Sequence, residues 1–258
     1  MFTIVQLSPT GNTAHLAKLL SDHLETNNLY ALEHTIPNEL PNTDHLIILF
    51  AIHAFNAPRT VKRFVKMIPP NKFKKVSLIA VGCNTSWVNN AASKEIRKIL
   101  ERKSYNIIVD DIIAMPLTFI MNFPEDVIKD QIDSAHKVIE KISLDIINSV
   151  VSKKQIPLKS HVIHGIGRVE PFASRFFGLE LHAKKSCIKC GLCVEECPEK
   201  NIQMKDNGKL KFGFNCMMCM RCLYNCPSQS ITPRISKFIP IKSGYSIEDY
   251  LSGEENEE

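Results

Sequence analysis

The chain has 258 residues and a mass of 29.2 kDa, with 44% hydrophobic and 23% charged residues. This ordinary globular composition excludes a disordered chain, a collagen and a miniprotein held by disulfides alone. The net charge of +5, from 32 basic and 27 acidic residues, is a modest excess that no nucleic-acid-reading motif accompanies, so we expect no nucleic-acid partner. No run reaches the roughly 18 apolar residues of a membrane span, and the N-terminus lacks a signal-peptide pattern. We expect a soluble, cytoplasmic protein.

The first 24 residues predict a strand, a polar turn and a helix. Residues 2–7 form a short apolar run suited to a buried strand, and the polar residues 8–13 follow at once. Leucines then recur at helical spacing, which predicts a helix with one apolar face against a sheet. These leucines are Leu16, Leu19, Leu20 and Leu24.

The turn, Ser-Pro-Thr-Gly-Asn-Thr, offers three hydroxyls, a glycine for close backbone approach and the N–H groups of a helix N-terminus. Such a turn binds anions. It lacks the Gly-Lys-Ser/Thr of a nucleotide triphosphate loop and the G-x-G-x-x-G of a dinucleotide fold. It resembles the FMN-phosphate loop of flavodoxins, although a chance Thr-Gly-Asn-Thr is the alternative. The resemblance implies FMN contacts from Ser8, Thr10, Gly11, Asn12, Thr13 and Ala14.

Further strands are predicted at residues 45–50, 76–82 and 107–114, with a weaker one near 29–35. Helix-length amphipathic segments separate them, which indicates a parallel sheet covered on both faces. We expect an α/β flavodoxin-like doubly wound sheet of order 2-1-3-4-5. In that order the ligand lies at the carboxyl ends of the first and third strands, where the strand order reverses.

The loops at residues 51–58 and 82–89 therefore become candidates for flavin contact. The residues that we expect to touch the ring are Phe55, Asn56, Gly82, Asn84 and Trp87. Trp87, the only tryptophan, is the best stacking candidate, and ordinary packing of a large aromatic is its alternative. Cys83 lies in the same loop, and we expect it to be buried and inert.

A predicted helix at residues 59–68 carries a basic stripe made of Arg59, Lys62, Arg63 and Lys66. A solvated helix face is the ordinary explanation of such a pattern. As a hypothesis, the stripe docks an acidic redox protein or reductase by electrostatic steering, which added salt weakens.

Eight of the nine cysteines form two blocks, each with the spacing C-x2-C-x2-C-x3-C-P, offset by 29 residues. Three closely spaced thiolates bind three irons of a [4Fe–4S] cube, and in two-cluster proteins the fourth cysteine comes from the other block. The first cluster then takes Cys187, Cys190, Cys193 and Cys226, and the second takes Cys216, Cys219, Cys222 and Cys197. A zinc site is disfavoured because the third cysteine of each block exceeds tetrahedral needs, and disulfides are disfavoured in a reducing compartment.

On these motifs, residues 181–234 resemble a bacterial-type two-[4Fe–4S] ferredoxin, a small α+β domain. One departure is Met220, which stands where the first block has Gly191. With the phosphate loop added, the chain resembles the flavodoxin–ferredoxin fusion proteins of anaerobes, the EFR-type ferrodoxins. The resemblance implies electron transfer with FMN and two [4Fe–4S] clusters.

We expect a flavodoxin-like FMN-binding domain at residues 1–150 and a linker with a docking helix at 151–180. The ferredoxin domain follows at 181–234, with a tail at 235–258 whose acidic end is disordered. No motif predicts a catalytic residue. Three functions remain: an electron carrier, an FMN-dependent reductase of a quinone, nitro compound or disulfide, and a ferredoxin whose N-terminal domain no longer binds FMN.

Overall fold

A computed structural model describes residues 1–121 and 123–251. The chain divides into two compact units. The first comprises Met1–Pro116 and Pro124–Arg168, and the second comprises Leu117–Phe123 and the residues from Val169 onward. The acidic end of the tail lies outside the described residues. No helix in the described part is long and apolar enough to cross a membrane.

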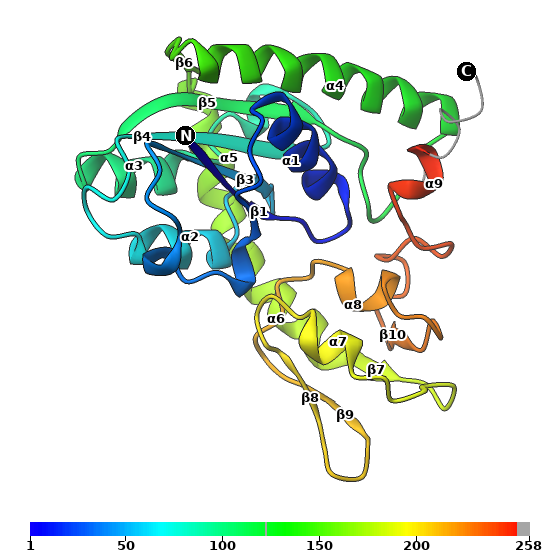
Figure 1. Ribbon diagram of the computed structural model, residues 1–258. Helices are drawn as coiled ribbons and strands as arrows, with labels where there is room; N and C mark the ends of the chain where they lie inside the picture. The colour runs from blue at the N-terminus through cyan, green and yellow to red at the C-terminus, as the bar shows by residue number, and fades with distance from the viewer. Residues whose placement is uncertain (122, 252–258) are drawn as a thin grey trace. The chain divides into compact units, whose positions relative to one another are not determined.

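A parallel sheet of order β2-β1-β3-β4-β5-β6 forms the centre of the first unit (Figure 1). Its strands are β1 (Phe2–Leu7), β2 (Leu29–Ala31), β3 (His45–Ala51), β4 (Lys75–Gly82), β5 (Asn106–Ala114) and β6 (Ser152–Lys153). The first five strands confirm the predicted order 2-1-3-4-5, which is the flavodoxin-like doubly wound arrangement. The strand order reverses between β1 and β3, so the loops that follow these two strands lie together at the carboxyl ends of the parallel strands.

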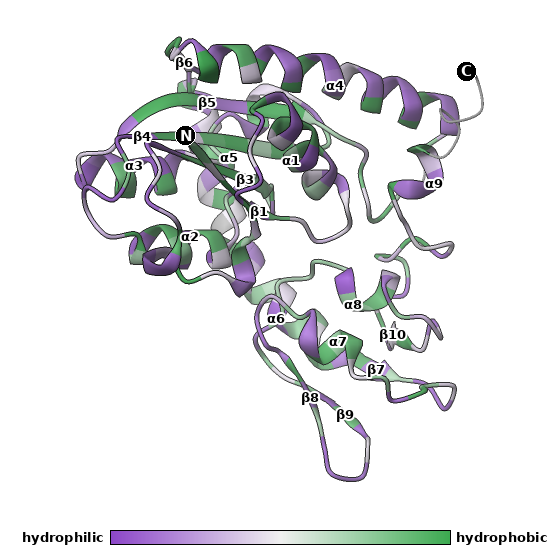
Figure 2. Ribbon diagram, viewed as in Figure 1, coloured by the Kyte–Doolittle hydropathy of each residue, from purple (hydrophilic) through white to green (hydrophobic). Residues whose placement is uncertain are grey.

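Helices cover both faces of this sheet. They are α1 (Asn12–His23), α2 (Arg59–Met67), α3 (Lys94–Arg102), α4 (Glu125–Ile147) and α5 (Leu158–Ile166). Figure 1 shows α1 and α4 over one face, and α2, α3 and α5 over the other. The central strands are hydrophobic along their length (Figure 2), and residues 46–50 of β3 are fully buried because helices cover the sheet on both sides.

The segment between the two expected domains is more ordered than a linker. Residues 152–153 form β6, which pairs with β5, and residues 158–166 form α5. Both belong to the first unit, which therefore extends beyond the expected boundary at residue 150. The weak strand near residues 29–35 is also shorter than expected, because it ends at Ala31 and the 3-10 turn η1 (Leu32–His34) follows it. Two further 3-10 turns are η2 (Pro37–Glu39), which precedes β3, and η3 (Trp87–Asn89), which follows β4.

The main part of the second unit begins at Val169, the last residue of η4 (Gly167–Val169), and its elements are short. They are α6 (Glu170–Glu180), β7 (Leu181–Ala183), α7 (Leu192–Glu195), β8 (Ile202–Met204), β9 (Leu210–Phe212), α8 (Arg221–Tyr224), β10 (Ile231–Pro233) and α9 (Glu248–Leu251). Antiparallel pairing joins β7 to β10 and β8 to β9. The offset of 29 residues that relates the cysteine blocks also relates α7 to α8 and β8 to β10, so the sequence repeat is a structural repeat.

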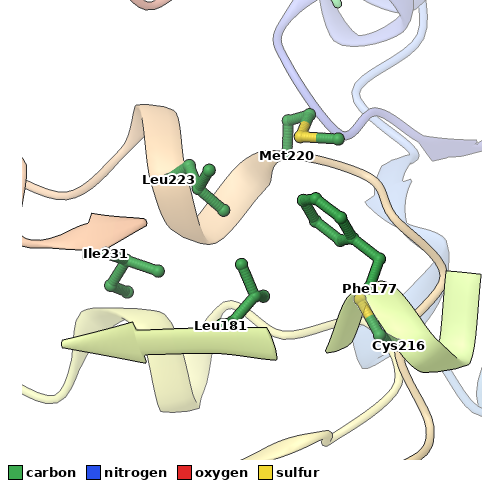
Figure 3. Packing of buried hydrophobic residues seen from close by; sticks show 6 residues of the cluster. All are labelled: Phe177, Leu181, Cys216, Met220, Leu223 and Ile231. Atoms are coloured by element: carbon green, nitrogen blue, oxygen red, sulfur yellow. The ribbon is translucent and has the colours of Figure 1, made fainter. Parts of the chain in front are cut away.

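A small hydrophobic core holds this unit together (Figure 3). It consists of Phe177, Leu181, Cys216, Met220, Leu223 and Ile231. The apolar residues of α6 divide between this core and solvent, because Phe177 is buried whereas Phe172, Phe176 and Leu179 are exposed.

Tyr224 ties two distant segments to this core. Its hydroxyl donates a hydrogen bond to Thr118 O at 2.7 Å and accepts one from Ile241 N at 3.0 Å. Residues 117–123 therefore belong to the second unit. The start of the tail packs as well, since Ile241, Tyr245 and Ile247 are buried.

Candidate functional site

The eight clustered cysteines line two cavities of the second unit. The first cavity is lined by Cys187, Cys190, Cys193 and Cys226, and the second by Cys197, Cys216, Cys219 and Cys222. Each cavity thus draws three cysteines from one sequence block and one from the other, in the interleaved grouping expected from the spacing. Cys222 also lines the first cavity and therefore lies between the two.

The two cysteine blocks share the same local backbone conformation. Three pairs of residues with positive φ recur at the offset of 29 residues: Lys189 with Met218, Gly191 with Met220, and Lys200 with Gln229. In both blocks the cysteine before the proline accepts a hydrogen bond from the backbone N–H four residues later. These bonds join Asn201 N to Cys197 Sγ at 3.2 Å and Ser230 N to Cys226 Sγ at 3.3 Å.

The two cavities differ in their exposure to solvent. At the first, Cys190 is exposed and the neighbouring Ile188 is 63% exposed. At the second, Cys216 is buried, and Phe177 and Met220 line the wall (Figure 3). Since Gly191 stands in the place of Met220 at the first cavity, part of this difference comes from the single departure between the blocks.

Burial and mutual proximity make the cysteine thiols hard to ionise. Burial, together with the neighbouring Cys187, Cys190 and Cys226, raises the pKa of Cys193 to about 11. Burial likewise raises the pKa of Cys219 to about 11 and the pKa of Cys222 well above its usual value.

Cys226 behaves in the opposite way. Burial opposes its ionisation, but hydrogen bonds from Ser230 and Ser228 lower the pKa of its thiol overall. Thiolates collected in one cavity repel one another, so such a site favours a strongly cationic occupant.

The donor set fits a [4Fe–4S] cube in each cavity. A cube binds one thiolate at each of its four irons, so it needs four sulfurs spread around a space. No group of three or more His, Cys, Asp or Glu side chains in residues 1–121 and 123–251 is placed to hold a single metal ion. The N–H groups that point at Cys197, Cys216 and Cys226 are the kind of donors that stabilise thiolates bound to iron.

The predicted phosphate loop lies at the carboxyl end of β1 and leads into α1. Gly11, with φ of 101°, precedes the helix in a conformation that a side chain disfavours. The first intrahelical bond runs from His15 N to Gly11 O at 2.9 Å, so the N–H groups of Thr13 and Ala14 have no acceptor within the helix. Together with the partly exposed Thr10, these groups form a turn that fits a phosphate.

Asn12 has a structural role in this loop. Asn12 is buried, and its Nδ2 donates to Pro116 O at 2.9 Å, which holds the helix start against the end of β5. Ser8 and Thr13 are also buried. The donor set of the loop therefore fits FMN phosphate through the loop backbone and Thr10, and Asn12 fixes the start of the helix.

The loop after β3 makes a tight turn. Its ends pair through two hydrogen bonds between the backbones of His53 and Asn56, both at 2.9 Å, and Ala54 and Phe55 have positive φ. Asn56 Nδ2 donates to Ala54 O at 2.8 Å and to the carbonyl of His164 in α5 at 3.3 Å. The amide group of Asn56 therefore joins the loop to α5, a contact that the sequence interpretation missed. Phe55 is partly exposed and remains a candidate for flavin contact.

The loop after β4 is also organised internally. Asn84 Oδ1 accepts from Ser86 N at 3.0 Å, and Asn89 Nδ2 donates to Asn84 O at 3.0 Å, so Asn84 shapes the turn that begins at Gly82. Cys83 is exposed, which contradicts the expected buried cysteine, because β4 ends at Gly82 and the chain leaves the sheet there.

Trp87, the expected stacking residue, is 37% exposed, and Lys159 Nζ lies 4.7 Å from its ring centroid. A cation from α5 thus already occupies one position over this ring. Stacking of Trp87 on a flavin stays a prediction.

The expected basic stripe lies on α2, but its residues differ in their exposure and in their ion pairs. Lys62 forms an ion pair with Glu95 at 2.5 Å, whereas Arg63 and Lys66 are exposed. The exposed part of the stripe is therefore the C-terminal half of the helix.

Comparison with known proteins gives one family match. The family of 4Fe-4S dicluster domains matches residues 180–227, which include all eight cavity cysteines. No curated protein matches the chain.

The solved structures that are similar to parts of the chain include the following three. A flavodoxin from the domain Archaea is 11% identical and covers 56% of this chain and 94% of its own, with a TM-score of 0.41. A short-chain flavodoxin associated with a bacterial microcompartment is 11% identical, with coverages of 58% and 98% and a TM-score of 0.42. General stress protein 14 of Treponema denticola, in complex with FMN, is 12% identical, with coverages of 57% and 95% and a TM-score of 0.34. The flavodoxin-like fold of the first unit rests on its own sheet order, and residues 180–227 match a 4Fe-4S dicluster domain.

Proposed function

We propose that this chain is an electron-transfer protein that holds two [4Fe–4S] clusters in its second unit and FMN in its first. The observation that carries the proposal is the interleaved grouping of eight cysteines into two cavities of four. A repeat that exchanges one ligand between its halves keeps two clusters close together, which suits electron transfer from one to the other. The proposal places the chain with the flavodoxin–ferredoxin fusion proteins that it resembles.

The chain's own residues do three things for the clusters. The thiols supply the ligands, the N–H groups of residues 201, 218 and 230 donate to three of the sulfurs, and the core around Met220 and Phe177 excludes water from the second cavity. Hydrogen bonds to sulfur and exclusion of water change cluster potentials in opposite directions. When bound, each cluster carries one electron at a time, and FMN exchanges electrons singly or in pairs.

In the first unit, the loop of residues 8–13 would hold the FMN phosphate. Its neutral hydroxyls and helix N-terminus favour a dianion without a basic side chain. The loops after β3 and β4 would flank the ring, with Phe55 and Trp87 as the aromatic residues in them. In this arrangement the flavin would lie where the strand order reverses.

Partners would dock by charge on the exposed part of α2. Arg63 and Lys66 are both exposed there, and exposed charges of one sign raise the rate of encounter with an oppositely charged protein. Electron exchange with a small acidic redox protein should slow in the variant R63Q/K66Q. It should not slow in K137Q, which removes an exposed lysine from α4. Equal rates in all three proteins would remove α2 from the proposal.

The proposal is tested by purifying the full chain without oxygen and measuring iron, sulfide and flavin. Two clusters and one flavin require about eight irons, about eight sulfides and about one FMN per chain. Iron and sulfide without flavin would restrict the function to that of a ferredoxin. A protein that binds zinc and no sulfide would contradict the proposal altogether.

A further inference from the structure

A third cavity of the second unit lies outside both cysteine cavities and has a volume of about 390 Å³. This volume falls in the range of pockets that bind small molecules. Its charged lining consists of Lys184, Lys237, Lys242 and Asp249. Three cations against one carboxylate favour an anionic occupant.

A turn in the tail brings polar groups to one wall of this cavity. Gly244, with φ of 79°, permits the turn, and Gly244 N donates to Ile241 O at 3.1 Å. The turn places Lys242, Ser243 and Ser246 around the cavity. Within the turn, Ser243 Oγ donates to Gly244 O at 3.3 Å and Ser246 Oγ donates to the Glu248 carboxylate, so the Lys242 ammonium group is the donor that the turn offers to phosphate oxygens.

The lysines of the lining keep hydrogen-bonding capacity for a ligand. Lys184 Nζ donates one long hydrogen bond, to Gln229 O at 3.4 Å, and an ammonium group has three protons. Lys237 and Lys242 are exposed at the cavity.

The remaining walls are aromatic and apolar. Tyr224 and Tyr245 line the cavity, and packing holds their rings in place because Tyr245 is 7% exposed and Tyr224 is half-buried. Pro233 and Pro240 add apolar surface. An inorganic anion would leave this surface unused, whereas an organic molecule with a planar ring would cover it.

Two apolar residues separate this cavity from the cysteine cavities. Leu223 lines both this cavity and the second cysteine cavity, and Ile231 lines both this cavity and the first. An occupant would therefore lie one layer of side chains from each set of sulfurs.

We propose that this cavity binds a phosphorylated aromatic small molecule of the nucleotide class. The lysines receive the phosphate, and the tyrosines receive the ring. A bound anion so close to the clusters opposes the addition of an electron, so it lowers their reduction potentials. This last consequence rests on the proposed function, whereas the binding itself does not.

The test is calorimetric titration of the full, anaerobically purified chain with AMP. The chain should bind AMP, and both adenosine and inorganic phosphate should bind at least about tenfold more weakly, because each lacks half of the contacts. The variant K237Q/K242Q should lose about tenfold or more in AMP affinity. The control K209Q, which removes an exposed lysine that lies just before β9 and outside the cavity, should bind as the unchanged chain does.

Absence of AMP binding, or an equal loss of affinity in K209Q, would overturn the proposal. Phosphate or adenosine binding as tight as AMP would overturn the assigned ligand class. AMP should also lower the cluster potentials in the unchanged chain and not in K237Q/K242Q. If the purified chain lacks clusters, the proposed function fails, and the titration still decides whether the cavity binds AMP.

Discussion

Met220 makes one of the most informative substitutions, because its backbone and its side chain have opposite effects on stability. Its φ of 63° lies in the left-handed region, which costs a residue with a β-carbon about 1–2 kcal/mol. Its side chain is 2% exposed and packs in the core of the second unit (Figure 3). The equivalent residue of the first block, Gly191, has φ of 85° and no atom within 4 Å of the position that a β-carbon would occupy.

These observations predict an order of stabilities. Replacing a buried methionine by alanine costs about 2–5 kcal/mol, so M220A should lose about 3 kcal/mol while it keeps the backbone penalty. M220G loses the same packing but removes that penalty, so it should be about 1 kcal/mol more stable than M220A. G191A meets no neighbour and should lose only the backbone term, about 1–2 kcal/mol.

Anaerobic unfolding in denaturant, followed by the bleaching of visible cluster absorbance, measures this order as rates of cluster loss. A difference of about 1.4 kcal/mol corresponds to a rate difference of up to about tenfold. The rates should rise in the order unchanged chain, G191A, M220G, M220A. If M220G bleaches as fast as M220A, the backbone argument is wrong; if M220G is as stable as the unchanged chain, the packing argument is wrong.

Three further predictions concern the flavin site, pH and access to the clusters. The variant T10A/T13A should retain less FMN than the unchanged chain, with the same iron content. The control T13S keeps the hydroxyl of this buried residue and should retain FMN. If T10A/T13A binds FMN as tightly as the unchanged chain, the assignment of this loop is wrong. Burial lowers the pKa of His45 to about 4 from its usual 6.5, so the stability that neutral His45 contributes is complete above pH 6.5 and is lost as pH falls toward 4. Between about pH 7.5 and about pH 5 this loss amounts to about 2 kcal/mol, and chemical denaturation of H45Q should lack that part of the pH dependence; an identical pH profile would refute it. An iron chelator should remove iron in two phases of about equal size, because Cys190 is exposed and Cys216 is buried, and release in a single phase would contradict that asymmetry.

Much of the fold follows from local sequence patterns. The strand runs, the leucine spacing of α1 and the position of the first polar turn predict alternating strands and helices, because each depends on neighbouring residues only. The strand order 2-1-3-4-5, which the structure has, was expected from the resemblance to flavodoxins. The two cysteine quartets also follow from spacing, since a repeat at a constant offset fixes equivalent backbone turns.

The features that the sequence analysis missed depend on contacts between distant residues. Asn56 binds the carbonyl of His164, and that contact uses an amide expected to face a flavin. Gly167 could have indicated this close approach between the loop after β3 and the end of α5, because a β-carbon at residue 167 would lie 1.9 Å from Ala54 O. Similarly, residues 117–123 join the second unit through Tyr224, and no periodicity marks such a contact.

The central claim is that the two cysteine sets interleave around two clusters. Iron counting in two double variants, each purified without oxygen, tests it most directly. Interleaving places Cys197 and Cys216 on the same cluster, so C197A/C216A should keep about four irons, whereas C187A/C197A should lose nearly all iron because it damages both clusters. The reverse result, with about four irons in C187A/C197A and almost none in C197A/C216A, would show that each block builds its own cluster and would contradict the account.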